Sequence, residues 1–185
     1  MEELVSVGDV PPANQPDAGG TFRLPPEAHA KIVALHEYWR RAAPGPGRLP
    51  GRQHIDPVDI PTLLANLWML DVVDESADGH ARRFRFRLIG TALQRVGLTA
   101  RVGDYLDQFI DEQVRAAALE ELHRVVTMRS PVWFRGKAFM RHESKSFELE
   151  RLLVPLAGDG TRVDIILCLT VFYTPRGQPI CSGPF

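Results

Sequence analysis

The sequence predicts one α+β domain built around a five-stranded, mostly antiparallel sheet. Five segments have the apolar runs or the two-residue alternation of strands, and they are residues 67–73, 84–88, 132–141, 147–155 and 163–173. Helical patterns separate the second segment from the third, whereas turn residues join the last three. Two strands, then helices, then three consecutive strands is an α+β order. The first and fifth strands are apolar on both faces and the second carries arginines on one face. We therefore expect the spatial order 2-1-5-4-3.

The chain divides into four parts by composition. Residues 1–25 carry Gly, Pro, Asp and Asn without periodicity, which predicts a disordered or loosely held arm. Residues 26–47 are expected to form a helix, running to about residue 42, and a connector rich in Pro and Gly. Residues 48–174 hold all five expected strands, and residues 175–185 are a tail. A total of 185 residues fits one domain with such extensions.

The N-terminal helix has one apolar stripe, formed by Ile32, Leu35 and Trp39. The fifth strand is apolar on both faces, and helices that cover one face would leave the other bare. We assign Ile166 and Phe172 to that second face. Soluble monomers seldom expose large apolar patches. We therefore expect the helix to dock there, in its own chain or across a two-fold axis, and we expect a homodimer.

Two further helices and two caps follow from local patterns. Apolar side chains recur at helical spacing over residues 111–129, which predicts a long helix, and residues 90–96 predict a short one. Asp56 is a favourable N-cap before Pro57, which fits the first helical position. We expect capping by Asp56 and Asp59 rather than a paired-carboxylate acid–base site.

Composition and charge exclude several classes of protein. The net charge of −1 argues against nucleic-acid binding by bulk electrostatics, and Arg83, Arg85 and Arg87 alternate as a solvated strand face does. No apolar run reaches the ~18 residues of a membrane helix, and the N-terminus lacks the basic start of a signal peptide. We expect a cytoplasmic protein in which the separated Cys168 and Cys181 form no disulfide and no metal is bound.

Several short motifs occur in a distinctive order. They lie at residues 39–40, 49–52, 55–57, 59–61, 63–64, 70–72, 84–91 and 103–107. In this order they resemble the PAS-like family of small alphaproteobacterial proteins, over about residues 28–173. The resemblance implies a PAS fold, in which a five-stranded sheet carries helices on one face and encloses a possible ligand cavity. It does not imply a particular ligand.

The resemblance places this cavity between the short helices and the inner face of the sheet. The residues expected to contact a ligand are Phe84, Phe86, Leu88, Leu149, Arg151, Leu167 and Leu169. Such a ligand would also contact the segment of residues 90–109. Arg151 continues the inward alternation of its strand, and a buried guanidinium needs an anion or several acceptors. It binds a ligand carboxylate or phosphate, pairs with an internal acid, or is turned outward by a bulge.

No cofactor is predicted. In haem-binding PAS proteins a histidine on the helix corresponding to residues 111–129 ligates iron, but His123 lies off the centre of the apolar stripe. Flavin-binding relatives carry an Asn-Cys-Arg motif on a helix, whereas Cys168 lies in a strand, where a small buried hydrophobe is expected. Haem and flavin are therefore not expected.

We expect a non-enzymatic sensory or protein-interaction module that binds a small molecule. The sequence ends soon after its last strand, so we expect signalling in trans to an unknown protein partner. Two alternatives stay open. One is an enzyme or binding protein with a cone-like α+β fold, similar to ketosteroid isomerase, with Asp71 as the general base. The other is a ligand-free structural adaptor.

Overall fold

The structure is a computed structural model that describes residues 22–75, 82–110, 112–139 and 146–180. The α-helices are α1 (Ala30–Arg41), α2 (Thr91–Arg95) and α3 (Glu112–Met128). The short 3-10 helices are η1 (Arg52–His54), η2 (Pro57–Asp59), η3 (Pro61–Asn66) and η4 (Leu106–Gln108). The strands are β1 (Leu67–Asp74), β2 (Arg82–Ile89), β3 (Val132–Phe139), β4 (Ser146–Leu156) and β5 (Ile165–Tyr173).

The strands form one sheet in the order β2-β1-β5-β4-β3, and every neighbouring pair is antiparallel. The predicted fold class and strand order are therefore confirmed. β5, whose residues are all buried, lies at the centre of the sheet. β2 lies at an edge, where Gly103 N donates to Phe86 O at 2.8 Å and Phe86 N donates to Asp104 O at 2.9 Å. These bonds satisfy backbone groups that the edge strand would otherwise leave unpaired.

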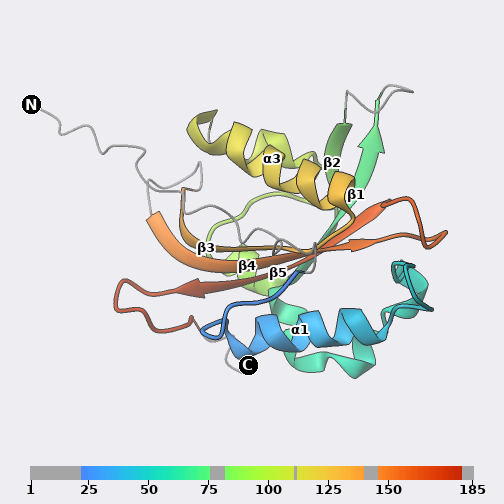
Figure 1. The fold of residues 1–185 in the computed structure, drawn as a ribbon. Coiled ribbons are helices and arrows are strands. Elements are labelled where there is room, and N and C mark those ends of the chain that lie inside the picture. The colour runs from blue at the N-terminus through green and yellow to red at the C-terminus, as the bar shows by residue number, and fades with distance from the viewer. Residues whose placement is uncertain (1–21, 76–81, 111, 140–145, 181–185) are drawn as a thin grey trace, which may run out of the picture.

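The sheet separates two layers of helices (Figure 1). We call the side that faces α3 the inner face and the side that faces α1 the outer face. Each face has its own apolar core: the inner core includes Phe84, Phe86 and Leu153, and the outer core includes Leu35 and Leu152. The fold therefore buries both sides of its central strands, as their continuous apolar sequence requires.

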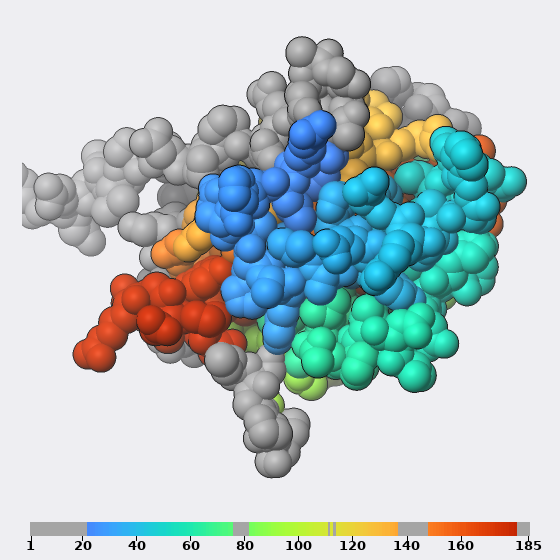
Figure 2. Space-filling view, turned by 60° about the horizontal axis from the view of Figure 1, so that its bottom comes forward, coloured from blue at the N-terminus to red at the C-terminus, as the bar shows by residue number. Residues whose placement is uncertain are grey.

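Helix α1 packs on the outer face of its own chain, against β4 and β5. Figure 2 shows α1, in blue, lying across this surface. Ile32 and Leu35 are fully buried, and the half-buried Trp39 donates from its indole Nε1 to Pro155 O at 2.8 Å. Docking of the helix on the outer face is therefore confirmed. Because one chain covers the patch, the homodimer is not needed for this purpose, and it stays a prediction.

The assignment of β5 residues to the two faces was wrong. Leu167 and Leu169 belong to the outer core, whereas Ile166 and Phe172 belong to the inner core. The register explains this, because Phe172 lies opposite Leu149, an inward-facing residue of β4. Residues directly opposite in an antiparallel pair share a face. A shift of one residue in β5 exchanges the two sets completely.

Leu88 also lies where the sequence did not predict it. The register between β1 and β2 shifts between Met69 and Leu70, so that Met69 faces Leu88 while Leu70 faces Phe86. The extra residue in β2 interrupts the alternation, as a β-bulge does. Leu88 therefore turns away from the inner core and is 38% exposed.

The turn before β1 confirms one of the two predicted caps. Asp56 accepts from Val58 N at 2.9 Å and Pro57 occupies the first position of η2. Asp59 caps no helix within the described residues, and its carboxylate instead lies 3.4 Å from the Tyr38 hydroxyl, which donates to it. Capping by Asp59 was therefore wrong, because η3 begins at Pro61 and its N-cap residue is Ile60, which makes no side-chain cap hydrogen bond.

The expected arm and tail are described only in part. Residues 1–21 and 181–185 lie outside the described residues, and so does Cys181. Residues 175–180 turn back along β5, where Ile180 N donates to Phe172 O at 2.7 Å. The C-terminal segment thus begins as an extension of the sheet.

Candidate functional site

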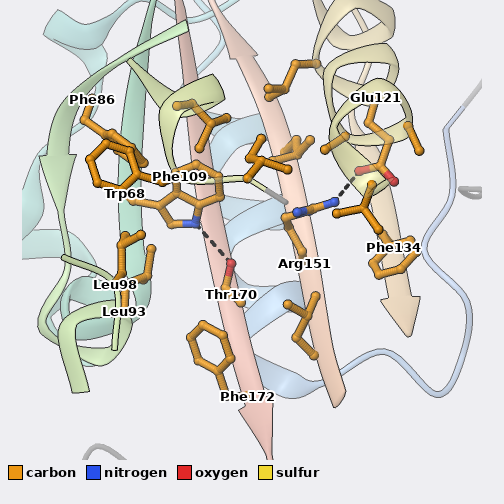
Figure 3. Close-up of a pocket in the computed structure, with 18 residues that line it drawn as sticks. Trp68, Phe86, Leu93, Leu98, Phe109, Glu121, Phe134, Arg151, Thr170 and Phe172 are labelled. Carbon is orange, nitrogen blue, oxygen red and sulfur yellow. Dashed lines mark hydrogen bonds and ion pairs between the residues drawn. The ribbon is translucent and has the colours of Figure 1, made fainter. Parts of the chain in front are cut away.

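A cavity of about 170 Å³ lies between the inner face and the helices that cover it (Figure 3). From the sheet it is lined by Trp68, Phe86, Phe134, Leu149, Arg151, Leu153, Thr170 and Phe172. From the helical side it is lined by Leu93, Leu98, Leu106, Phe109, Ile110, Val114, Ala117, Ala118, Glu121 and Leu122. All five strands contribute, so the cavity sits against the middle of the sheet. Its walls are aromatic and aliphatic with few polar groups, as in small-molecule sites.

Three residues of the predicted ligand set line this cavity: Phe86, Leu149 and Arg151. Phe84 lies in the inner core beside it but does not line it. Leu88 lies beyond the bulge, and Leu167 and Leu169 lie on the outer face. The expected contribution from residues 90–109 is present, since Leu93, Leu98, Leu106 and Phe109 line the cavity. Ligand contact by any of these residues stays a prediction.

Arg151 faces inward and forms an ion pair with Glu121 of α3. Its Nη2 donates a hydrogen bond to Oε2 of Glu121. Both side chains are mostly buried, at 19% and 11% exposed. The Arg151 guanidinium also lies over the Phe134 ring, 5.3 Å from its centroid. Of the three possibilities for Arg151 given above, the structure shows the pairing with an internal acid. The pair ties α3 to β4 across one end of the cavity (Figure 3).

Trp68 and Thr170 form the second polar contact of the cavity wall. The indole Nε1 of Trp68 donates to Thr170 Oγ1 at 3.0 Å, and both residues are buried. Thr170 lies directly opposite Arg151 in the β4–β5 ladder. Polar groups of the sheet are therefore gathered at one place on an otherwise apolar surface.

On the outer face, Glu150 is fully buried beside Arg151 in the chain. Its carboxylate accepts from His29 N at 2.8 Å, from Trp133 Nε1 at 2.9 Å and from the Tyr173 hydroxyl at 2.8 Å. Burial of Tyr173 and its hydrogen bond to Glu150 raise the pKa of the Tyr173 hydroxyl. His29 is the N-cap of α1, so Glu150 attaches the start of that helix to the sheet.

Asp71 does not fit the role of a general base. Its side chain lies on the outer side of β1, opposite Arg85, and not toward the cavity. It forms ion pairs with Arg85 at 3.2 Å and with Arg87 at 3.0 Å. The alternative with an inward Asp71 in a cone-like enzyme is therefore wrong. The arginines of β2 have partners on their own sheet face.

His123 and Cys168 lie near the cavity without lining it. The His123 ring packs edge-on against Phe84 with 5.3 Å between centroids, and burial followed by the charge of Arg82 lowers its pKa. Cys168 is fully buried on the inner face, and burial raises the pKa of its thiol well above its ordinary value. The prediction that Cys168 is a buried hydrophobe is confirmed.

Sequence reasoning missed Trp68, Glu121 and Thr170. Glu121 could have been found, because it lies three residues after Ala118 and four before Val125 on the stripe of α3. An acid on that stripe was a candidate partner for an inward arginine. Trp68 and Thr170 could not be placed without the register of β5.

Two classes of site have no support in the described part of the chain. No group of three or more His, Cys, Asp or Glu side chains there could hold a metal ion. No helix of residues 22–75, 82–110, 112–139 or 146–180 is long and apolar enough to cross a membrane.

Comparison with known proteins identifies the fold. The family model described as PAS domain matches residues 27–170, which include all five strands except the end of β5. No curated protein matches the chain. PAS domains are sensory or interaction modules, and the match spans most of the sequence. The chain therefore belongs to the PAS domain family.

Proposed function

We propose that this protein is a sensory module that binds a small apolar molecule in the cavity on the inner face. The observation that carries this proposal is the cavity of about 170 Å³ with an arginine in its wall. An engineered apolar cavity of about 150 Å³ takes up benzene. A molecule of about one ring would therefore fit here, whereas pockets for drug-sized ligands measure roughly 300–1,000 Å³.

In this proposal helix α3 carries the response. An occupant contacts Ala118 and Leu122 of α3 directly, and it lies beside the ion pair that joins Glu121 to Arg151. A shift of α3 would change the surface of the domain on its inner side. A separate partner protein reads this change, so the module signals in trans.

Thermal unfolding in the presence of toluene tests the binding step. A ligand that binds only the folded state at ten times its Kd stabilises it by about 1.4 kcal/mol. For a chain of this length such a gain raises Tm by about 3–6 °C. Ala118→Leu fills the cavity and should abolish the rise, since Ala118 lines it.

Ala116→Leu is the matched control, because Ala116 lies on the same helix, is exposed and does not line the cavity. It should keep the full toluene response. If toluene leaves the Tm of the unmodified protein unchanged, the cavity is not a binding site. A ligand-free interaction module would then be the better description.

A further inference from the structure

Arg151 has more hydrogen-bond donors than the described residues use. A guanidinium carries five N–H groups, and Arg151 donates one hydrogen bond, to Glu121. Its Nε is buried and has no partner within the described part of the chain. Buried donors are almost always satisfied, and an exception calls for an explanation. A ligand acceptor in the adjoining cavity would supply the missing partner.

The Thr170 hydroxyl is a second donor, beside the guanidinium of Arg151. Its Oγ1 accepts from Trp68 at 3.0 Å, so its hydroxyl hydrogen is directed elsewhere. Because Thr170 pairs directly with Arg151 in the sheet, both donors lie on the same patch of the inner face. One acceptor atom at this patch could therefore receive hydrogen bonds from both residues.

The charges around the cavity favour a neutral ligand. Arg151 and Glu121 are the only ionisable residues among the described residues that line it, and they neutralise each other. A ligand carboxylate would add an unbalanced negative charge within an apolar enclosure, or would have to displace Glu121 from Arg151. Burying an unpaired charge is much more costly than burying a hydrogen-bonded carbonyl.

We infer that the cavity selects a neutral molecule of about one ring that carries a hydrogen-bond acceptor, such as a carbonyl oxygen, bound by Arg151 and Thr170. This inference rests on the proposed function and names the ligand class for the same site. The ring packs among the aromatic residues of the wall, including Trp68, Phe86 and Phe109. The acceptor oxygen lies at the polar patch.

Isothermal titration calorimetry of the full chain with three probes tests the ligand class. Acetophenone is neutral and carries an acceptor, ethylbenzene has a similar shape without one, and benzoate is anionic. A hydrogen bond from a charged donor should make the Kd of acetophenone about tenfold lower than that of ethylbenzene. Benzoate should bind at least about tenfold more weakly than acetophenone, because of its charge.

Two variants locate the effect. Arg151→Met should bring the Kd of acetophenone up to that of ethylbenzene while ethylbenzene still binds. Glu121→Gln leaves Arg151 with an unbalanced positive charge, so it should strengthen benzoate binding above that of acetophenone. If a variant does not fold, the ranking of the Kd values of the three probes on the unmodified protein still tests the ligand class.

The outcomes separate this inference from the proposed function. Equal binding of ethylbenzene and acetophenone, or tighter binding of benzoate, overturns the ligand class but leaves a small-molecule site. Failure of all three probes to bind overturns the proposed function as well.

Discussion

Replacing Glu150 with alanine tests the buried network that joins α1 to the sheet. The carboxylate is fully buried and accepts three hydrogen bonds, from His29 N, Trp133 Nε1 and the Tyr173 hydroxyl. Alanine leaves all three donors without this acceptor. Each buried donor left unsatisfied costs about 1–3 kcal/mol. The bond from Tyr173 is buried and those from His29 and Trp133 are part-buried. We therefore expect the free energy of unfolding to fall by about 2–4 kcal/mol, a large part of the roughly 5–15 kcal/mol of a typical domain.

Equilibrium urea unfolding measures this loss, and amide hydrogen exchange localises it. Protection of the amides of α1 should fall more than that of β5, because Glu150 holds the start of that helix. Glu148→Ala is the matched control, since Glu148 lies two residues earlier on β4, is 41% exposed and pairs with Arg135 at 3.3 Å. Exposed pairs of this kind contribute about 1 kcal/mol or less. If Glu150→Ala costs no more than Glu148→Ala, the network does not attach α1.

Three further predictions follow from single residues. A Cβ at Gly90 would lie 2.3 and 2.5 Å from two backbone carbonyl oxygens, so Gly90→Ala should destabilise by about 1–3 kcal/mol in urea unfolding, whereas Gly45→Ala, with no atom within 4 Å, should not. Burial lowers the pKa of His123 below 6.5, so its contribution to stability is present above about pH 6.5 and is lost as the pH falls. His123→Phe should therefore lose less stability than the unmodified protein between pH 7 and 5. An unchanged dependence of the free energy of unfolding on pH would contradict this. In a Cys181→Ser background, the buried Cys168 should react with a thiol reagent at pH 8 only after unfolding, and fast labelling of the native protein would refute its burial.

Periodicity was enough to predict the architecture. Alternation and apolar runs predicted the strands, and the spacing of apolar residues predicted α1 and α3. The order of these elements predicted the sheet. Central and edge strands could be told apart because β5 is apolar throughout whereas β2 alternates Phe84 and Phe86 with arginines. These features depend on neighbouring residues in the chain, so they can be predicted from the sequence alone.

The faces of β5 could not be predicted in the same way. Ile166 and Leu167 are equally apolar, so burial favours neither orientation and only the pairing with β1 and β4 decides. The bulge that turns Leu88 outward depends on the partner strand as well. The cavity was therefore placed correctly between sheet and helices, while four of its seven expected sheet residues, including Leu167 and Leu169, do not line it.

The three tryptophans of the sequence permit the most direct test of the central claim, that a small molecule binds on the inner face. Trp68 lines the cavity, whereas Trp39 and Trp133 belong to the outer core. In ¹H–¹⁵N spectra each indole N–H gives its own signal, which can be followed as acetophenone is added. We predict a saturable shift of the Trp68 signal with the other two unmoved. An unmoved Trp68 signal, or equal shifts of all three, would contradict binding in this cavity.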